Sequence, residues 1–381
     1  MKRKSKSKAQ LIASQLRANR RLSSKIRKVL KRKGKVSTSS RKNPSRRSAP
    51  RKHIFVQAPE GLDLYNRKAH LKTVTFIKEL TKAAKVSHDR DLPVRLCFRH
   101  TTRISASGGI YLYAVTDSLK VKYPKLSFIV AHPPKKPDRV NHENISVVQA
   151  VLKQIKFYSL IGVSVPKVKE LPNVDCWATA QSEKVDSDLL GAAIQKLEPY
   201  GVNTHELFRA GVEAMANAAE HAYDKTIRTN RSFPKKEWWL FTAVLEKKLI
   251  VYICDLGHGI PVTMPHTQKA DVLTKIKSKV TNALGQLGHG KAPVDGDVFQ
   301  IQASTLVKET RTELGHRGKG GNDIRSFIDN NNRSSLYIFS NKGTWKYKST
   351  PTKKGLGIGY NNKHSIDGTV IGWSIPLSAE D

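Results

Sequence analysis

The first 52 residues of this 381-residue chain contain no Asp and no Glu, although they hold 21 of its 68 Lys and Arg residues. The rest of the chain is less one-sided, with 47 basic against 31 acidic residues. Apolar residues are too sparse in this basic arm to build a core, so we expect residues 1–52 to be disordered, or helical only when bound. Their composition suits a polyanionic partner, nucleic acid first and an anionic membrane second. The alternative is a solvated tail with incidental charge.

Cysteine is scarce too: Cys97, Cys176 and Cys254 are widely spaced and form no Cys-x-x-Cys pair. This usage indicates a reducing compartment and argues against structural zinc. No apolar run reaches transmembrane length, and no signal-peptide core follows the basic start. We therefore expect a cytoplasmic protein without a transmembrane segment. A Walker loop is also missing, because no Gly-x-x-x-x-Gly-Lys-Ser/Thr pattern occurs.

The stretch HELFRAGVEAMANAAEHAY at residues 205–223 is typical of a helix, because it is rich in Ala and contains no Pro. Its polar residues share one stripe of that helix, since they recur every three or four positions: Glu206, Arg209, Glu213, Asn217 and Glu220. The Glu213 carboxylate can accept a proton from an attacking water or hydroxyl, and the Asn217 amide oxygen can ligate a hard cation such as Mg²⁺. Taken alone, the stripe also fits an amphipathic helix with a solvated polar face.

A buried strand is predicted at LIVYICD, which is a continuous apolar run that ends in Asp255. An acidic side chain at the end of a strand can accept a hydrogen bond from an adenine amino group. Gly257 and Gly259 follow, and glycines let the backbone approach a base closely. The alternative is an ordinary glycine-rich turn.

Two further stretches complete the pattern. HRGKGGNDIRSFID places glycines before a predicted helix, whose positive end attracts phosphate, and Arg317 and Lys319 add charge there. DGTVIGWSIPL reads as a turn followed by a strand near the C-terminus. Each of these stretches is a weak signal by itself, and the first also fits a helix that is entered through a flexible loop.

In this order the four stretches resemble the GHKL ATPases, and most closely their serine-kinase anti-sigma branch, over about residues 185–381. The resemblance implies a pocket for ATP and Mg²⁺ with Glu213 as catalytic base and Asn217 as metal ligand. It makes Asp255 the adenine acceptor. It also assigns the remaining nucleotide contacts: Gly257, Gly259 and Ile260 around the base, Arg317, Gly318, Lys319 and Gly320 at the phosphates, and Thr369 behind the adenine.

About sixty residues separate Gly259 from Gly318, which is long for a connection within a domain. We expect residues 262–317 to form a lid that orders over bound ATP. The alternative is an insertion with short helices of its own, roughly at 269–284, and both descriptions can hold together.

Residues 53–170 alternate predicted helices and strands, which indicates a small α/β domain. A strand, then Ser-Ala-Ser-Gly-Gly and a helix resemble a STAS domain. Aligned with that family, Ala106 stands where the phosphorylated serine belongs, so we expect this domain to sense or dock. Ser105 and Ser107 fit equally well as N-cap residues. Residues 171–184 are the expected linker.

We therefore expect an α/β protein, an α+β sandwich with a GHKL (Bergerat) ATP-binding fold, a STAS-like domain before it and a disordered arm. The leading functional hypothesis is a nucleotide-gated ATPase switch that acts on a macromolecular partner. We expect that partner to be a protein, and the sequence is also compatible with an oligomer. The second is a serine/threonine protein kinase that uses Glu213. The third is a non-enzymatic nucleic-acid-binding protein that senses ATP.

Overall fold

The structure, a computed structural model, describes residues 52–133, 136–137, 144–167, 174–195, 198, 204–245, 247–268, 274–278, 296–306, 320–331, 333–348 and 357–377. Lys52–Asp381 is one compact unit. Nearly all of the basic arm lies outside the described residues. None of the helices in the described part of the chain has the length and apolarity needed to cross a membrane.

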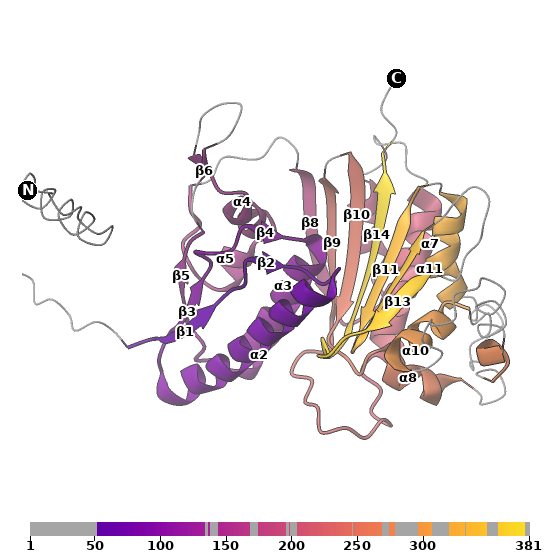
Figure 1. The fold of residues 1–381 in the computed structure, drawn as a ribbon, viewed down its shortest axis with the longest axis horizontal. Helices are drawn as coiled ribbons and strands as arrows, with labels where there is room; N and C mark the ends of the chain where they lie inside the picture. Colours follow the sequence, from indigo (N-terminus) through magenta and orange to yellow (C-terminus); the bar gives the residue numbers. More distant parts are fainter. Residues whose placement is uncertain are drawn as a thin grey trace, which may run out of the picture. The chain divides into compact units, whose positions relative to one another are not determined.

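A seven-stranded antiparallel sheet dominates the C-terminal half (Figure 1). In spatial order its strands are β13 (Ile358–Asn361), β12 (Gly343–Lys348), β11 (Ser335–Ser340), β14 (Thr369–Pro376), β10 (Lys248–Asp255), β9 (Trp238–Leu245) and β8 (Val174–Ser182). The strands predicted at LIVYICD and after Gly368 are confirmed as β10 and β14. They are neighbours, with Asp255 opposite Thr369 in the register. The mixed helix and strand content confirms the α/β class.

The two faces of this sheet belong to two hydrophobic cores. Trp238, Val251 and Ile338 point to one side, where they pack with helices α6 (Ser187–Gln195), α7 (Thr204–Ala216) and α11 (Gly320–Asn330). Trp239 and Phe339, the next residues along β9 and β11, point to the other side. Because both faces are covered, β10 carries apolar residues at nearly every position instead of alternating with polar ones.

The second core is completed by an α/β layer from the N-terminal half. Its three-stranded parallel sheet has the order β1 (Ile54–Gln57), β3 (Val94–Cys97) and β5 (Phe128–Ala131). Its helices are α2 (Arg67–Arg90), α3 (Ala106–Lys122), α4 (Val147–Gln154) and α5 (Phe157–Leu160). Short pairs join β2 (Gly61–Leu62) to β4 (Arg103–Ile104), and β6 (Lys136–Pro137) to β7 (Asn144–Ile145). The helices and strands predicted here are confirmed.

Helix α3 begins where the Ser-Ala-Ser-Gly-Gly stretch predicted a helix start. The Ser105 hydroxyl caps it by accepting the Gly108 N–H at 3.2 Å. The same hydroxyl lies 3.2 Å from both the Leu62 carbonyl and an Asp63 carboxylate oxygen. Ser105 is therefore an N-cap residue, as one of the two interpretations of this stretch expected.

The N-terminal layer shares its core with the large sheet and does not enclose a separate one. Side chains of β9, β10, β11 and β14 belong to the same cluster of buried residues as those of α2 and α3. Hydrogen bonds cross between the two parts: the Tyr65 and Tyr252 hydroxyls bond each other, and Tyr111 donates to the Ile366 carbonyl. In the stretch expected as a linker, residues 174–182 form β8, the edge strand beside β9.

Candidate functional site

A cavity of about 330 Å³ opens beside the C-terminal end of α7, between this helix and α8 (Ile260–Thr267). We call it the α7 cavity. Six of the eleven residues assigned from the sequence line it: Glu213, Asn217, Asp255, Gly259, Ile260 and Thr369. The sheet thus brings together stretches that are far apart in the chain.

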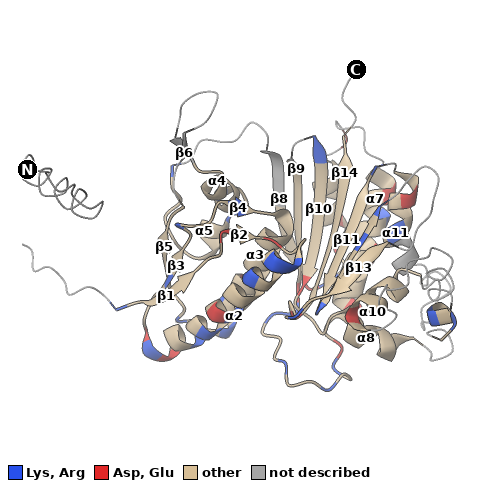
Figure 2. Ribbon diagram, in the orientation of Figure 1, with Lys and Arg blue, Asp and Glu red and all other residues tan. Residues whose placement is uncertain are grey.

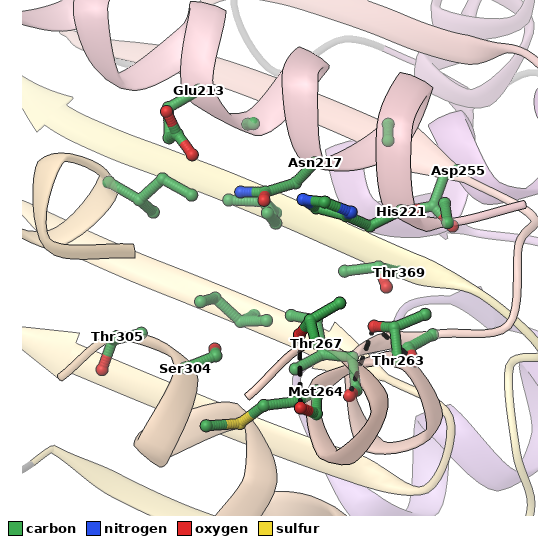
Figure 3. A pocket seen from close by; sticks show the side chains of 18 of the residues that line it. Glu213, Asn217, His221, Asp255, Thr263, Met264, Thr267, Ser304, Thr305 and Thr369 are labelled. Carbon is green, nitrogen blue, oxygen red and sulfur yellow. Dashed lines mark hydrogen bonds between the residues drawn. The ribbon is translucent and has the colours of Figure 1, made fainter. Parts of the chain in front are cut away.

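The polar groups are spread along the length of the α7 cavity (Figure 3). Asp255 and Thr369 lie at one end of the view, and Glu213 lies toward the other. Ser304 and Thr305 come from the end of α10 (Gly296–Ser304) and the residue after it, on the Glu213 side. An elongated ligand could therefore meet different chemistry at its two ends.

Helix α7 changes its geometry at the cavity. It becomes a π-helical turn at Asn217–His221, where the Ala222 N–H donates to the Asn217 carbonyl at 3.1 Å. The Ala222 carbonyl in turn accepts the His258 N–H at 2.7 Å. Single π-helical turns inside helices often mark functional sites. Here the turn joins the helix end to the loop that follows Asp255.

Gly257 has a different place from the one expected. It is absent from the described lining of the α7 cavity, and its Cα faces the π-helical turn. A Cβ at this position would lie 2.1 Å from the Ala222 carbonyl oxygen. Glycine is needed at 257 because the two backbones meet there, and only glycine leaves room for the contact.

Gly259 and Ile260 are held on the other side of the same loop. Gly259 has φ +83°, and a Cβ there would lie 2.7 Å from the Asn341 amide. The Ile260 N–H donates to the Ser340 hydroxyl at 2.9 Å, and that hydroxyl lies 2.9 Å from the hydroxyl of Thr369. These bonds fix the start of α8 against β11 and β14.

The Asp255 carboxylate is buried at the end of β10 and accepts the Gly257 N–H at 2.8 Å. Burial raises its pKa from 3.8 to about 6, and the Gly257 N–H, the Arg231 guanidinium and Thr369 oppose that rise. Arg231 holds the surrounding backbone by donating to the carbonyls of Leu256 at 3.2 Å and Asp367 at 2.6 Å. A buried acceptor of this kind must be matched by a donor on any ligand that covers it.

Glu213 and Asn217 are both half-buried at the wall of the α7 cavity. The other members of the polar stripe have different surroundings: Arg209 and Glu220 are exposed, and Glu206 accepts from the Asn330 amide of α11 at 2.9 Å. The stripe is therefore divided along the helix. Only its C-terminal half offers a carboxylate and an amide to a bound ligand.

Several lining residues carry no assignment from the sequence, among them His221, Thr263, Thr267, Ser304 and Thr305. His221 follows Asn217 by one turn, so helical spacing could have found it. The threonines of α8 and the end of α10 gave no signal, because they lie within the long segment after Gly259. Only the packing of α10 against α8 brings Ser304 and Thr305 to the site.

The phosphate-loop residues are described only in part. Arg317, Gly318 and Lys319 lie outside the described residues, and Gly320 is the first residue of α11. Ile324, one turn further along, lines the α7 cavity. In the expected lid, α8 and α10 share a small apolar cluster with Ile276 of the helical segment 274–278, which agrees with an insertion that has helices of its own.

The sequence matches no protein-family model and none of the curated proteins.

Proposed function

We propose that the α7 cavity binds ATP and that this chain is a GHKL-type ATPase that works as a nucleotide-gated switch. One observation carries the proposal: the Glu213/Asn217 pair, the Asp255 loop and Thr369 lie around one cavity on one face of an antiparallel sheet. The volume of the α7 cavity, about 330 Å³, falls within the range of small-molecule pockets.

The adenine is placed at the Asp255 end. A buried carboxylate there can accept from the exocyclic amino group, whereas guanine would present a keto oxygen to it. Leaving that carboxylate unpaired carries a desolvation cost, so the wrong base should be rejected strongly. Gly259 and Thr369 fit the same end, because a tight backbone and a small hydroxyl leave space for a flat ring.

The phosphates are placed toward Glu213 and Asn217. The first turn of α11 lies one turn before Ile324, and the N-terminal end of a helix favours anions. The described residues contain no cluster of three or more His, Cys, Asp or Glu side chains that could hold a metal by themselves. Asn217 fits Mg²⁺ as a single amide-oxygen ligand, and a bound Mg²⁺ would neutralise phosphate charge.

Glu213 is the proposed general base. Its carboxylate lies on the same helix stripe as Asn217 and can take the proton of a water or hydroxyl nucleophile. Water as nucleophile gives ATP hydrolysis, and a protein hydroxyl gives phosphoryl transfer. In the switch we propose, nucleotide binding reorganises α8 and α10, which line the cavity and could pass the change to a macromolecular partner. The STAS-like assignment of residues 53–170 stays part of this proposal, as a docking module.

Incubation of the full chain with γ-labelled ATP and Mg²⁺ tests the chemistry. Free labelled phosphate supports the ATPase switch. Label on protein supports the serine/threonine kinase instead. Neither product, together with tight duplex DNA binding, supports a protein that only senses nucleotide.

Base selection tests the pocket independently of turnover. We expect ATP to displace a labelled ATP analogue, and GTP at the same concentration to leave most of it bound. Equal displacement by GTP would contradict the placement of adenine at Asp255.

A further inference from the structure

A second cavity of about 390 Å³ lies on the other side of the Asp255 loop, between α2, α3, the 231–235 loop and the 365–367 turn. We call it the α2 cavity. Its floor is apolar, with Val74 and Ile77 from α2 and Val115 and Leu119 from α3. The α7 cavity and the α2 cavity have no lining residue in common.

The charge around the α2 cavity is strongly one-sided. Five described cationic residues line it, Lys78, Lys82, Lys122, Arg231 and Lys235, against one acidic residue, Asp367. Figure 2 shows the Lys and Arg residues of α2 in blue.

Two of these cations are already used within the protein. Lys235 pairs with Asp117 at 2.6 Å and with Glu237 at 3.0 Å. Arg231 donates to the Leu256 and Asp367 carbonyls, as described above. Both side chains therefore form part of the cavity wall, where they stabilise the fold through these contacts.

The other three cations are not held in the wall by ion pairs or backbone bonds, although the Lys122 ammonium lies 5.7 Å from the centroid of the Tyr123 ring. Lys78, Lys82 and Lys122 are exposed at the rim, and none of them makes an ion pair within the described part of the chain. Lys78 and Lys82 are four residues apart on α2, a spacing at which like charges destabilise a helix. A negatively charged group over the rim would relieve that repulsion.

We propose that the α2 cavity is a second ligand site, which binds a small organic anion with an apolar body. The apolar floor takes the body of the ligand, and Lys78, Lys82 and Lys122 meet its phosphate, sulfonate or carboxylate group. The volume of the cavity suits one small molecule. This site does not depend on the nucleotide proposal, because none of the residues that line it lines the α7 cavity.

The experiment uses the full chain and 8-anilinonaphthalene-1-sulfonate, a soluble aromatic anion, as the probe in equilibrium dialysis. The first variant is Lys78→Glu with Lys82→Glu, which reverses two rim charges. The matched control is Lys68→Glu with Lys72→Glu, because both lysines are exposed, four apart and on the same helix, yet outside the described lining. A third variant, Thr81→Trp, fills the cavity from an exposed rim position without changing charge.

We expect the Lys78/Lys82 variant and Thr81→Trp each to lose one equivalent of bound probe, or to bind it about tenfold more weakly, because one removes the charge complement and the other the space. The Lys68/Lys72 control should bind like the wild type. The basic arm is present in every protein compared, so its background is the same. Circular dichroism checks that each variant is folded.

Three results would overturn the proposal. Equal loss in the Lys68/Lys72 control would show that the probe follows general positive charge. Unchanged binding in both cavity variants would show that the probe binds elsewhere. Binding to phosphatidylglycerol vesicles without binding of the soluble probe would assign these lysines to a membrane surface.

Discussion

Ile338 and Phe339 are neighbours on β11, yet they serve opposite faces of the same sheet. Ile338 packs in the core beneath α7 and α11 and lines the α7 cavity, whereas Phe339 packs in the core shared with α2 and α3. The second face is closed by aromatic contacts, since the Tyr65 ring lies edge-on to Tyr337 and Phe339 at 4.8 and 5.7 Å between centroids.

The two faces of the sheet differ in the cavities that open on them. On the α3 face, the rings of Tyr65, Tyr337 and Phe339 pack beside β11, and the α2 cavity lies between α2 and α3. On the α7 face, the π-helical turn and the Asp255 loop meet through their backbones, and a cavity with polar walls opens beside them. The nucleotide function we propose therefore depends on incomplete packing on the α7 face, and incomplete packing on the α3 face leaves the α2 cavity.

The largest effect should come from the base on the α7 face. Glu213→Ala should retain ATP binding but lower turnover by about two orders of magnitude or more, because it removes the carboxylate that we propose takes the proton. Asn217→Ala should weaken Mg²⁺-dependent nucleotide binding itself. Glu220→Ala, at an exposed position of the same helix, is the control. Unchanged turnover in the Glu213 variant would remove Glu213 from the proposed chemistry.

The next largest effect should come from the backbone contact between Gly257 and Ala222, beside the α7 cavity. Gly257→Ala should lower the free energy of unfolding by roughly 2–4 kcal/mol, because its Cβ would meet the Ala222 carbonyl. Gly191→Ala is the matched control: the nearest atom to its Cβ would be a Phe208 ring carbon at 3.8 Å. That change in α6 should be neutral or stabilising by up to about 1 kcal/mol. Urea unfolding measures both, and equal stability of the two variants would contradict this role of Gly257.

The buried carboxylate gives the α7 face a pH dependence. Because the pKa of Asp255 rises from 3.8 in the unfolded chain to about 6 in the folded one, its contribution to stability falls as pH increases from about 4 to 6, and is constant above that. Asp255→Asn should therefore match the wild type near pH 4 and exceed its stability by roughly 2–3 kcal/mol at pH 7. Urea unfolding at the two pH values measures the difference.

The affinity for ATP should depend on the ionisation of Asp255 in the opposite direction to the stability. The ionised carboxylate is the stronger acceptor for an amino group, so wild-type affinity should fall as pH decreases through about 6. The amide introduced by Asp255→Asn does not titrate, so the affinity of that variant should be weaker and should not change over this pH range. Parallel pH profiles for the two proteins would contradict this account.

A smaller effect should separate the two faces directly. Ile338→Val and Phe339→Leu should each lower the free energy of unfolding by roughly 1 kcal/mol, because each removes buried volume. Only Ile338→Val should change nucleotide affinity, since only Ile338 lines the α7 cavity. Equal changes in affinity would mean that the two faces are coupled more tightly than their separate cores indicate.

Removal of residues 1–51 should have the smallest effect on the α7 face. Basal ATP turnover should be unchanged, because none of the four stretches that predict the nucleotide pocket lies in the arm. If the arm binds nucleic acid through phosphates, its deletion should abolish most of the salt dependence of DNA binding. A truncated chain with the same salt slope would show that the arm is a solvated tail.

The sequence determined the local parts of the site. Period and composition placed Glu213 and Asn217 on one helix stripe, Asp255 at the end of a buried strand and Thr369 at the start of another, because each depends on neighbours within a few positions. The sequence predicts a linker at residues 171–184 and misses β8 within it, because an edge strand that pairs on only one side has a weak pattern of its own.

Only the tertiary structure decided what these parts do together. The π-helical turn after Ala216 exists because Ala222 finds partners at Gly257 and His258, and no local pattern records a contact over that separation. β9 and β11 carry apolar side chains on both sides of the strand, and packing against helices from both halves of the chain buried both faces. The α7 cavity lies where that packing stays incomplete beside the backbone contact between Gly257 and Ala222, and the α2 cavity lies where it stays incomplete between α2 and α3.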